Sequence, residues 1–189
     1  TVYAGNWAGQ VIRSFNRGQS WEPFTTADAY VFSVSPDPAG DDVFVSTIGA
    51  VRHHDGDGAW LEAFNSYNTG VGWWFIDDVH LGRKSGLMWI ASLENGVTSF
   101  DGERWFNLGS HNPNEPWPAL ADGAEGVFED SKGNVWIGTN GIGRWDGESF
   151  TLWDWRNNPG IGVGSFSHIG EDKNGVIWAG ESYGGLFRL

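Results

Sequence analysis

Residues 129–147 read Glu-Asp-Ser-Lys-Gly-Asn-Val-Trp-Ile-Gly-Thr-Asn-Gly-Ile-Gly-Arg-Trp-Asp-Gly, and this stretch decides the fold. Residues around Trp136 alternate as in a β-strand. Two turn signals follow, at Asn140-Gly141 and Asp146-Gly147. Such dipeptides favour tight hairpin turns, because their central residues need positive φ. We therefore expect a buried Trp136 on one short strand, a second antiparallel strand after it, and positive φ at both glycines.

The same pattern recurs along the chain at intervals of about 41 to 47 residues. Each copy has an aromatic residue close to a Ser, Ala or Gly, and we expect the small residue to let the next sheet approach closely. A turn and a further strand follow each copy, and another strand precedes most of them. The repeated aromatics are Tyr3, Phe44, Trp89, Trp136 and Trp178. The preceding strands are expected at 30–35, 74–81, 125–130 and 166–172.

This arrangement predicts an all-β protein, a β-propeller built of four-stranded antiparallel blades. We expect one propeller domain over residues 1–189, with about five repeat units. The units span about 1–24, 25–66, 67–109, 110–155 and 156–189. The first unit starts at its second strand and the last stops at its third, so the two ends overlap rather than complement each other. Three arrangements stay open: a compact five-bladed ring, a piece of a larger propeller, and a protomer that oligomerises or contacts a parent protein through its incomplete terminal blades.

Residues 129–147 resemble the two-component regulator propeller repeat, whose pattern joins Asp-x-x-Gly, an apolar-Trp-Ile-Gly-Thr strand and a later Asp-Gly. The resemblance is close around Trp136, recognisable around Trp89 and Trp178, and weak around Phe44. It implies a ligand-sensing domain that is extracellular or periplasmic. Residues 14–21, Ser-Phe-Asn-Arg-Gly-Gln-Ser-Trp, are similar to the Asp-box of sialidase-type (BNR-like) propellers, with Asn in place of Asp. That motif is a structural turn and does not imply a sialidase.

Composition excludes several classes of partner. The chain has 11 Lys and Arg against 24 Asp and Glu, a formal charge of −13, and no Cys. A field of that sign repels phosphate, so nucleic acid and anionic membranes are poor partners. The apolar runs are far shorter than the roughly 20 residues of a transmembrane helix, so we expect no membrane insertion. Without Cys there is neither a disulfide nor a thiolate metal site, and we expect no cofactor.

Aromatics without a repeat equivalent point to a binding site. They fall in or beside the connections between units and the turns between second and third strands, which share one end of a propeller, and asparagines accompany them. Aromatic rings stack on the apolar face of a sugar while amides bond its hydroxyls. The sequence therefore predicts a carbohydrate or protein ligand at this end. The candidate ligand-binding residues are Trp7, Trp74, Asn95, Trp117, Asn140, Trp155 and Tyr183.

No catalytic or metal-ligating residues are assigned. His53 and His54 point to opposite sides of a strand, so they do not easily share an ion. His80 and His168 are expected at similar places near the central channel. The acid pairs, interpreted as turn caps, are Asp77-Asp78, Glu129-Asp130 and Glu171-Asp172.

We expect a non-catalytic sensing or binding module for a carbohydrate or another exported polymer. Two alternatives remain. One is a polysaccharide hydrolase or lyase, whose candidate acids are Asp154, Glu115 and Glu181. The other is a protein-binding scaffold or assembly component.

Overall fold

The computed structural model describes residues 1–69, 71, 75–107, 123–182 and 185–189. Within these ranges the chain forms eighteen strands in five antiparallel sheets and no helix. The first sheet holds β1 (Val2–Gly5), β2 (Gln10–Ser14) and β3 (Glu22–Thr26). The second holds β4 (Val31–Pro36), β5 (Val43–Thr47), β6 (Ala50–His54) and β7 (Trp60–Phe64). The third holds β8 (Ile76–Leu81), β9 (Met88–Ser92), β10 (Gly96–Phe100) and β11 (Trp105–Asn107).

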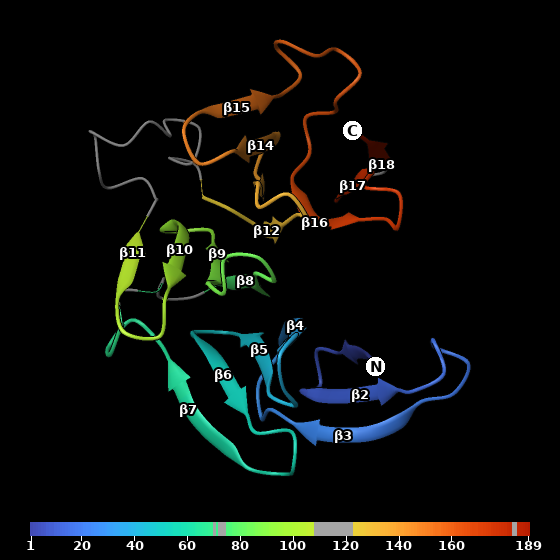
Figure 1. The fold of residues 1–189 in the computed structure, drawn as a ribbon, viewed down its shortest axis with the longest axis vertical. Helices are drawn as coiled ribbons and strands as arrows, with labels where there is room; N and C mark the ends of the chain where they lie inside the picture. Colours follow the sequence, from blue (N-terminus) through green and yellow to red (C-terminus); the bar gives the residue numbers. More distant parts are fainter. Residues whose placement is uncertain (70, 72–74, 108–122, 183–184) are drawn as a thin grey trace.

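The fourth sheet holds β12 (Gly126–Glu129), β13 (Val135–Gly138), β14 (Ile142–Trp145) and β15 (Phe150–Trp153). The fifth holds β16 (Phe166–Glu171), β17 (Ile177–Glu181) and β18 (Gly185–Arg188). Each sheet is a meander in which consecutive strands pair. The sheets follow one another around an arc, with the innermost strand of each sheet in contact with that of the next sheet (Figure 1). This is the predicted five-blade β-propeller.

The two terminal sheets have three strands each, as the repeat predicted. Hydrogen bonds identify β1 as the second strand of its blade. The carbonyl of Asn6, after β1, accepts from the N–H of Val31 at 3.2 Å. The carbonyl of Thr139, after β13, accepts in the same way from Phe166 at 3.0 Å. The first sheet therefore lacks an inner strand and the last lacks an outer one, and these two sheets lie at the ends of the arc in Figure 1.

The small residues of the second strands allow neighbouring blades to approach. A Cβ atom on Gly138 would collide with the carbonyl oxygen of Phe166, and one on Gly5 would collide with the side chain of Val31. Any larger residue at these positions would push two blades apart. The expected close approach is confirmed at both glycines.

Gly147 and Gly141 require glycine for different reasons. Gly147 has a φ of +100°, as predicted for an Asp-Gly turn. The prediction for Gly141 was wrong, since its φ is not positive. What requires glycine there is space: a Cβ atom on Gly141 would lie 2.6 Å from the carbonyl oxygen of Trp153.

The core consists of four apolar clusters, each between consecutive blades. Trp89 and Trp136 are buried, as predicted, at 6% and 7% exposure. Phe44 and Trp178 are only half-buried. The predicted burial is therefore confirmed for the two tryptophans of the central blades and only partly met at the two other positions.

Acid pairs at the ends of first strands link the blades. Asp130 accepts hydrogen bonds from the backbone of Lys132 and Asn134 in its own turn, and from Trp136 Nε1 at 2.8 Å. Its neighbour Glu129 accepts instead from the backbone N–H of Lys84, in the turn of the preceding blade. The turn-cap interpretation is therefore confirmed, with one acid holding its own turn and the other the neighbouring turn.

Asp78 does not cap a turn, so that interpretation was wrong for this residue, whereas the Asp77 carboxyl accepts a backbone hydrogen bond from Leu93 in the β9–β10 turn. Both lie within β8, and the Oδ2 atom of Asp78 accepts from the N–H of Val127 in the next blade at 3.0 Å. Burial raises the pKa of both carboxyls to about 7. Asp78 is therefore an inter-blade contact that the repeat did not reveal.

Candidate functional site

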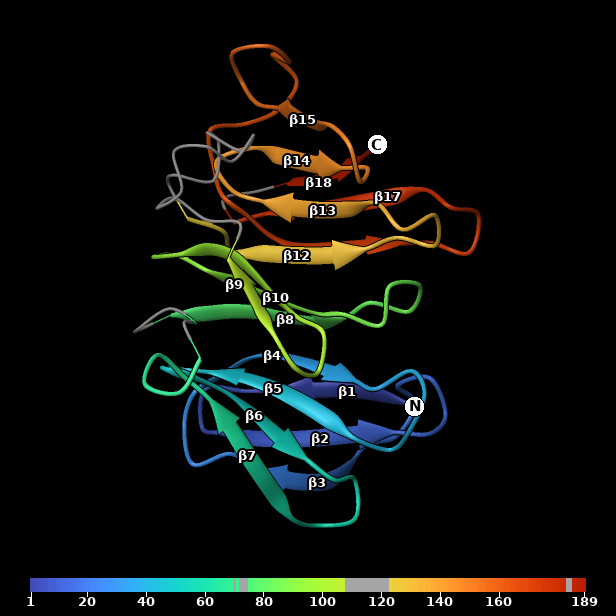
Figure 2. The same ribbon diagram turned by 60° about the vertical axis from the view of Figure 1, so that its left-hand side comes forward.

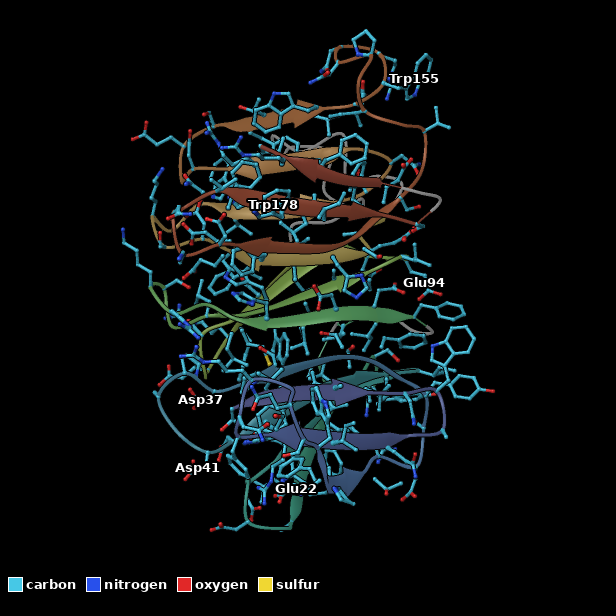
Figure 3. All side chains as sticks on the ribbon, turned by 90° about the vertical axis from the view of Figure 1, so that its right-hand side faces the viewer. Glu22, Asp37, Asp41, Glu94, Trp155 and Trp178 are labelled. Carbon is cyan, nitrogen blue, oxygen red and sulfur yellow. The ribbon has the colours of Figure 1, made fainter. Side chains whose placement is uncertain are left out.

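The connections gather at two ends of the blades, because the strands run across the molecule in a common direction (Figure 2). One end, which we call the loop face, carries the connections between blades and the turns between second and third strands. The other, the turn face, carries the remaining hairpin turns. In Figure 3, Glu94 lies on the loop face, and Asp37 and Asp41 lie at the opposite end.

Trp7 stands on the loop face in the turn between β1 and β2. Its side chain is 73% exposed, and its ring centroid lies 6.3 Å from that of Tyr30, which is 52% exposed. The Asn6 side chain fixes the turn, since its Oδ1 accepts from the N–H groups of Ala8 and Gln10 at 2.9 and 3.1 Å. The short, braced turn therefore holds the Trp7 ring in solvent beside the ring of Tyr30, which lies just before β4.

A second group of rings lies on the next two blades. Phe75, just before β8, is 41% exposed, and its ring lies 6.1 Å from that of half-buried Phe32. Ile48 forms an isolated bridge with Phe75 and is 40% exposed. We call the whole group the aromatic patch. It comprises Trp7, Tyr30, Phe32, Ile48 and Phe75.

Sequence reasoning named only Trp7 of this patch. Tyr30 and Phe32 were assigned to a strand, where alternation suggests packing rather than exposure. One available signal was the run of aromatics that ends at Phe75, which has no repeat equivalent.

The other predicted site residues lie apart from the patch. Trp155 is 52% exposed between β15 and β16, under the guanidinium of Arg156 at 5.9 Å, and Figure 3 places it far along the molecule from the first blade. Asn140 is exposed in the β13–β14 turn, and half-buried Asn95 lies in the β9–β10 turn, where its N–H donates to Ser92 Oγ. Trp74, Trp117 and Tyr183 lie outside the described residues.

The described acids considered for catalysis hold the connections between blades through hydrogen bonds and an ion pair. Asp154 accepts from the N–H of Arg156 at 2.8 Å and forms an ion pair with its guanidinium at 2.9 Å. Glu181 accepts from the N–H of Gly164 at 2.7 Å, which joins β17 to the preceding connection. Glu115 lies outside the described residues. Neither described acid is presented to a substrate by this geometry.

His53 and His54 point to opposite sides of β6, as predicted for adjacent residues of a strand. His53 Nε2 lies 2.7 Å from Asp42 Oδ2, and its ring stacks on Phe44 at 4.3 Å. His54 is buried in the opposite direction, against Trp60 and Phe24, where burial lowers its pKa. Among the residues that the structure describes, no three His, Cys, Asp or Glu side chains come together as a metal site.

A central channel lies between the first strands of the blades. It holds a cavity of about 240 Å³ that both His80 and His168 line, together with Ser33 and Asp78. Burial lowers the pKa of His80 to about 4, while that of Asp78 is raised to about 7. At neutral pH the channel is therefore polar, with a neutral imidazole and a partly protonated carboxyl.

Comparison with known proteins agrees with the repeat and the fold. A family model described as the two component regulator propeller matches residues 124–141, and no curated protein matches the chain. The extracellular domain assigned to the hybrid two-component system BT3049 of B. thetaiotaomicron is 23% identical, with a TM-score of 0.64 over 98% of this chain and 27% of that one. The extracellular domain assigned to the one-component system BT4673 of the same organism is 15% identical, with a TM-score of 0.70 over 98% and 24%.

An enzyme is also among the similar structures. A catalytically inactive variant of virginiamycin B lyase from Staphylococcus aureus is 16% identical, with a TM-score of 0.65 over 97% of this chain and 63% of that one. Identities this low establish the propeller fold alone. The chain spans about a quarter of the length of the two bacterial extracellular domains. In the described part of the chain, no helix is long and apolar enough to cross a membrane.

Proposed function

We propose that this chain is a non-catalytic sensing module that binds a neutral or basic carbohydrate polymer through the aromatic patch. The observation that carries the proposal is the solvent-exposed pair of Trp7 and Tyr30, with ring centroids 6.3 Å apart. The regulator propeller match at residues 124–141 supports a role in sensing. The similar bacterial domains are described as extracellular, which supports an extracellular or periplasmic location.

The patch suits a sugar because it combines rings with polar neighbours. An aromatic face packs on the C–H face of a pyranose and contributes about 1 kcal/mol. The Tyr30 hydroxyl and the exposed Gln10 side chain add groups that bond hydroxyls. The net charge of −13 disfavours strongly acidic glycans.

A polymer explains the wide spacing of the predicted residues better than a monosaccharide does. Trp155 is exposed on the fourth blade, well away from the first. Asn95 and Asn140 lie on intervening blades, and with Trp155 we retain them as contacts for an extended ligand. We retain Trp74, Trp117 and Tyr183 in the same role on sequence grounds.

We also propose that residues 14–21 form an Asp-box-type structural turn. Ser14 Oγ accepts from the N–H of Gly18, and Asn16 Oδ1 accepts from that of Ser20, both at 2.9 Å. These bonds use the side chains inside the turn, which supports a structural rather than a ligand-binding role.

A glycan array tests the proposed function. The wild type is expected to bind neutral or basic glycans without turnover, and Trp7→Ala is expected to lose most of the signal. Trp21→Ala is the matched control, because Trp21 is also exposed, at 42%, but lies in the turn between β2 and β3 on the turn face. Sugar release from the bound glycan would support the enzyme alternative, and no glycan binding at all would leave the scaffold alternative.

A further inference from the structure

A groove of about 320 Å³ opens on the turn face between the second and third blades. Its floor is apolar, with Phe44 from one blade and Leu81, Met88 and Phe100 from the other. Gly102 stands at its wall, and no heavy atom lies within 4 Å of the point where its Cβ would be. We call this the inter-blade groove. It lies at the opposite end of the blades from the aromatic patch.

Carboxylates accompany this apolar floor. Glu62, exposed on β7, and Asp101, at the end of β10, both line the groove. Asp101 Oδ1 accepts from the N–H groups of Glu103 and Arg104 at 2.8 and 2.7 Å. These bonds lower the pKa of Asp101 and keep it ionised. His53 also lines the groove, stacked on one face of Phe44 and paired with Asp42, and no Lys or Arg is among the described residues that line it.

The surroundings extend the negative charge. Asp37 and Asp41 lie at this end of the second blade in Figure 3. Asp55 and Asp57 add two more carboxylates in the turn after β6. The acidic surface therefore extends beyond the groove, over an area larger than one small cation would occupy.

We propose that the inter-blade groove receives an arginine side chain from a basic segment of a partner protein. The apolar stem and the flat face of the guanidinium pack on Phe44 and Phe100, while the charge meets Glu62 and Asp101. Arginine fits better than lysine, because its planar group both stacks on aromatic rings and pairs with carboxylates. The acidic surface around the groove attracts the rest of the segment and speeds its association. This interaction is independent of glycan binding on the other face.

A peptide titration tests the proposal. The probe is an acetylated, amidated nonapeptide of alternating glycine and arginine, and its comparison peptide carries citrulline in place of arginine. Calorimetry at low salt is expected to show binding of the arginine peptide only. Equal binding of the citrulline peptide, or no binding of either, would overturn the proposal.

Two substitutions at Glu62 and one control charge reversal elsewhere locate the interaction. Glu62→Lys is expected to weaken arginine-peptide binding by about tenfold, since it adds repulsion to the loss of an ion pair. Glu62→Gln is expected to weaken it by about threefold, the scale of one exposed pair. Glu148→Lys is the matched control, because it makes the same charge change at an exposed site in the turn after β14 and is expected to change affinity less than about twofold.

Equal losses in Glu62→Lys and Glu148→Lys would show diffuse charge attraction and refute the groove. Urea denaturation of both variants checks the fold. Both side chains are exposed, so wild-type stability is expected in each.

Discussion

Trp136→Ala tests how the repeat holds neighbouring blades together. The indole is 7% exposed and stacks on Trp153 with centroids 5.9 Å apart. Its Nε1 donates to Asp130 Oδ2 at 2.8 Å. Truncating a buried Trp to Ala costs about 3 to 5 kcal/mol of unfolding free energy. We add nothing for Asp130, because Asn134 Nδ2 still donates to the same oxygen at 2.7 Å.

Urea denaturation with an unchanged m-value measures this cost. Two comparisons show its origin. Trp136→Phe keeps a ring in the core, and the lost N–H adds little because Asn134 still pairs with Asp130, so its cost is expected below about 1.5 kcal/mol. Trp155→Ala removes a half-exposed indole and is expected to stay within about 0.5 kcal/mol. A cost below about 1 kcal/mol for Trp136→Ala, or equal costs for Trp136→Ala and Trp155→Ala, would refute the assigned packing.

Three further predictions concern turns, pH and the outer loop. Gly147→Val is expected to cost about 1 to 3 kcal/mol through its positive φ, and Gly141→Val is expected to destabilise through collision with Trp153, both seen as lower melting temperatures. The folded pKa of Asp78 lies near 7, above its unfolded value of 3.8, so its contribution to stability falls as pH rises from about 4 to 7. In urea titrations the free energy of unfolding of Asp78→Asn should therefore rise relative to that of the wild type over that range, and the difference should stay constant above it. The lowered pKa of His80 changes stability with the opposite sign, and it does so in both proteins. Trp155→Ala is expected to weaken binding of a long glycan but not of a short oligosaccharide in calorimetry, and equal losses for both would remove Trp155 from the proposed extended site.

The blades could be predicted from the sequence because equivalent core positions recur in every blade. Trp89 and Trp136 occupy equivalent positions, and both are buried. The turn conformation at Gly147 could also be predicted, because one Asp-Gly dipeptide determines it. Gly141, in an Asn-Gly dipeptide, carries a similar turn signal, but glycine is required there by the close approach of Trp153 in the adjacent strand and not by a positive φ.

Contacts between blades were harder to predict. Asp78 bonds the backbone of Val127, 49 residues away in the chain, and no local pattern marks that pairing. The aromatic patch was missed for the same reason. Exposure of Tyr30 depends on which surfaces the adjacent blade covers, and alternation along one strand cannot supply that information.

Calorimetric titration of an array-selected neutral glycan into three proteins tests the central claim most directly. The proteins are the wild type, Trp7→Ala and Trp21→Ala, with melting temperatures measured alongside. We predict that Trp7→Ala weakens binding by at least about fivefold, the equivalent of one stacked ring at about 1 kcal/mol, with its melting temperature unchanged and with wild-type affinity in Trp21→Ala. Wild-type affinity in Trp7→Ala, or an equal loss in both variants, would contradict the assignment of the aromatic patch as the glycan site.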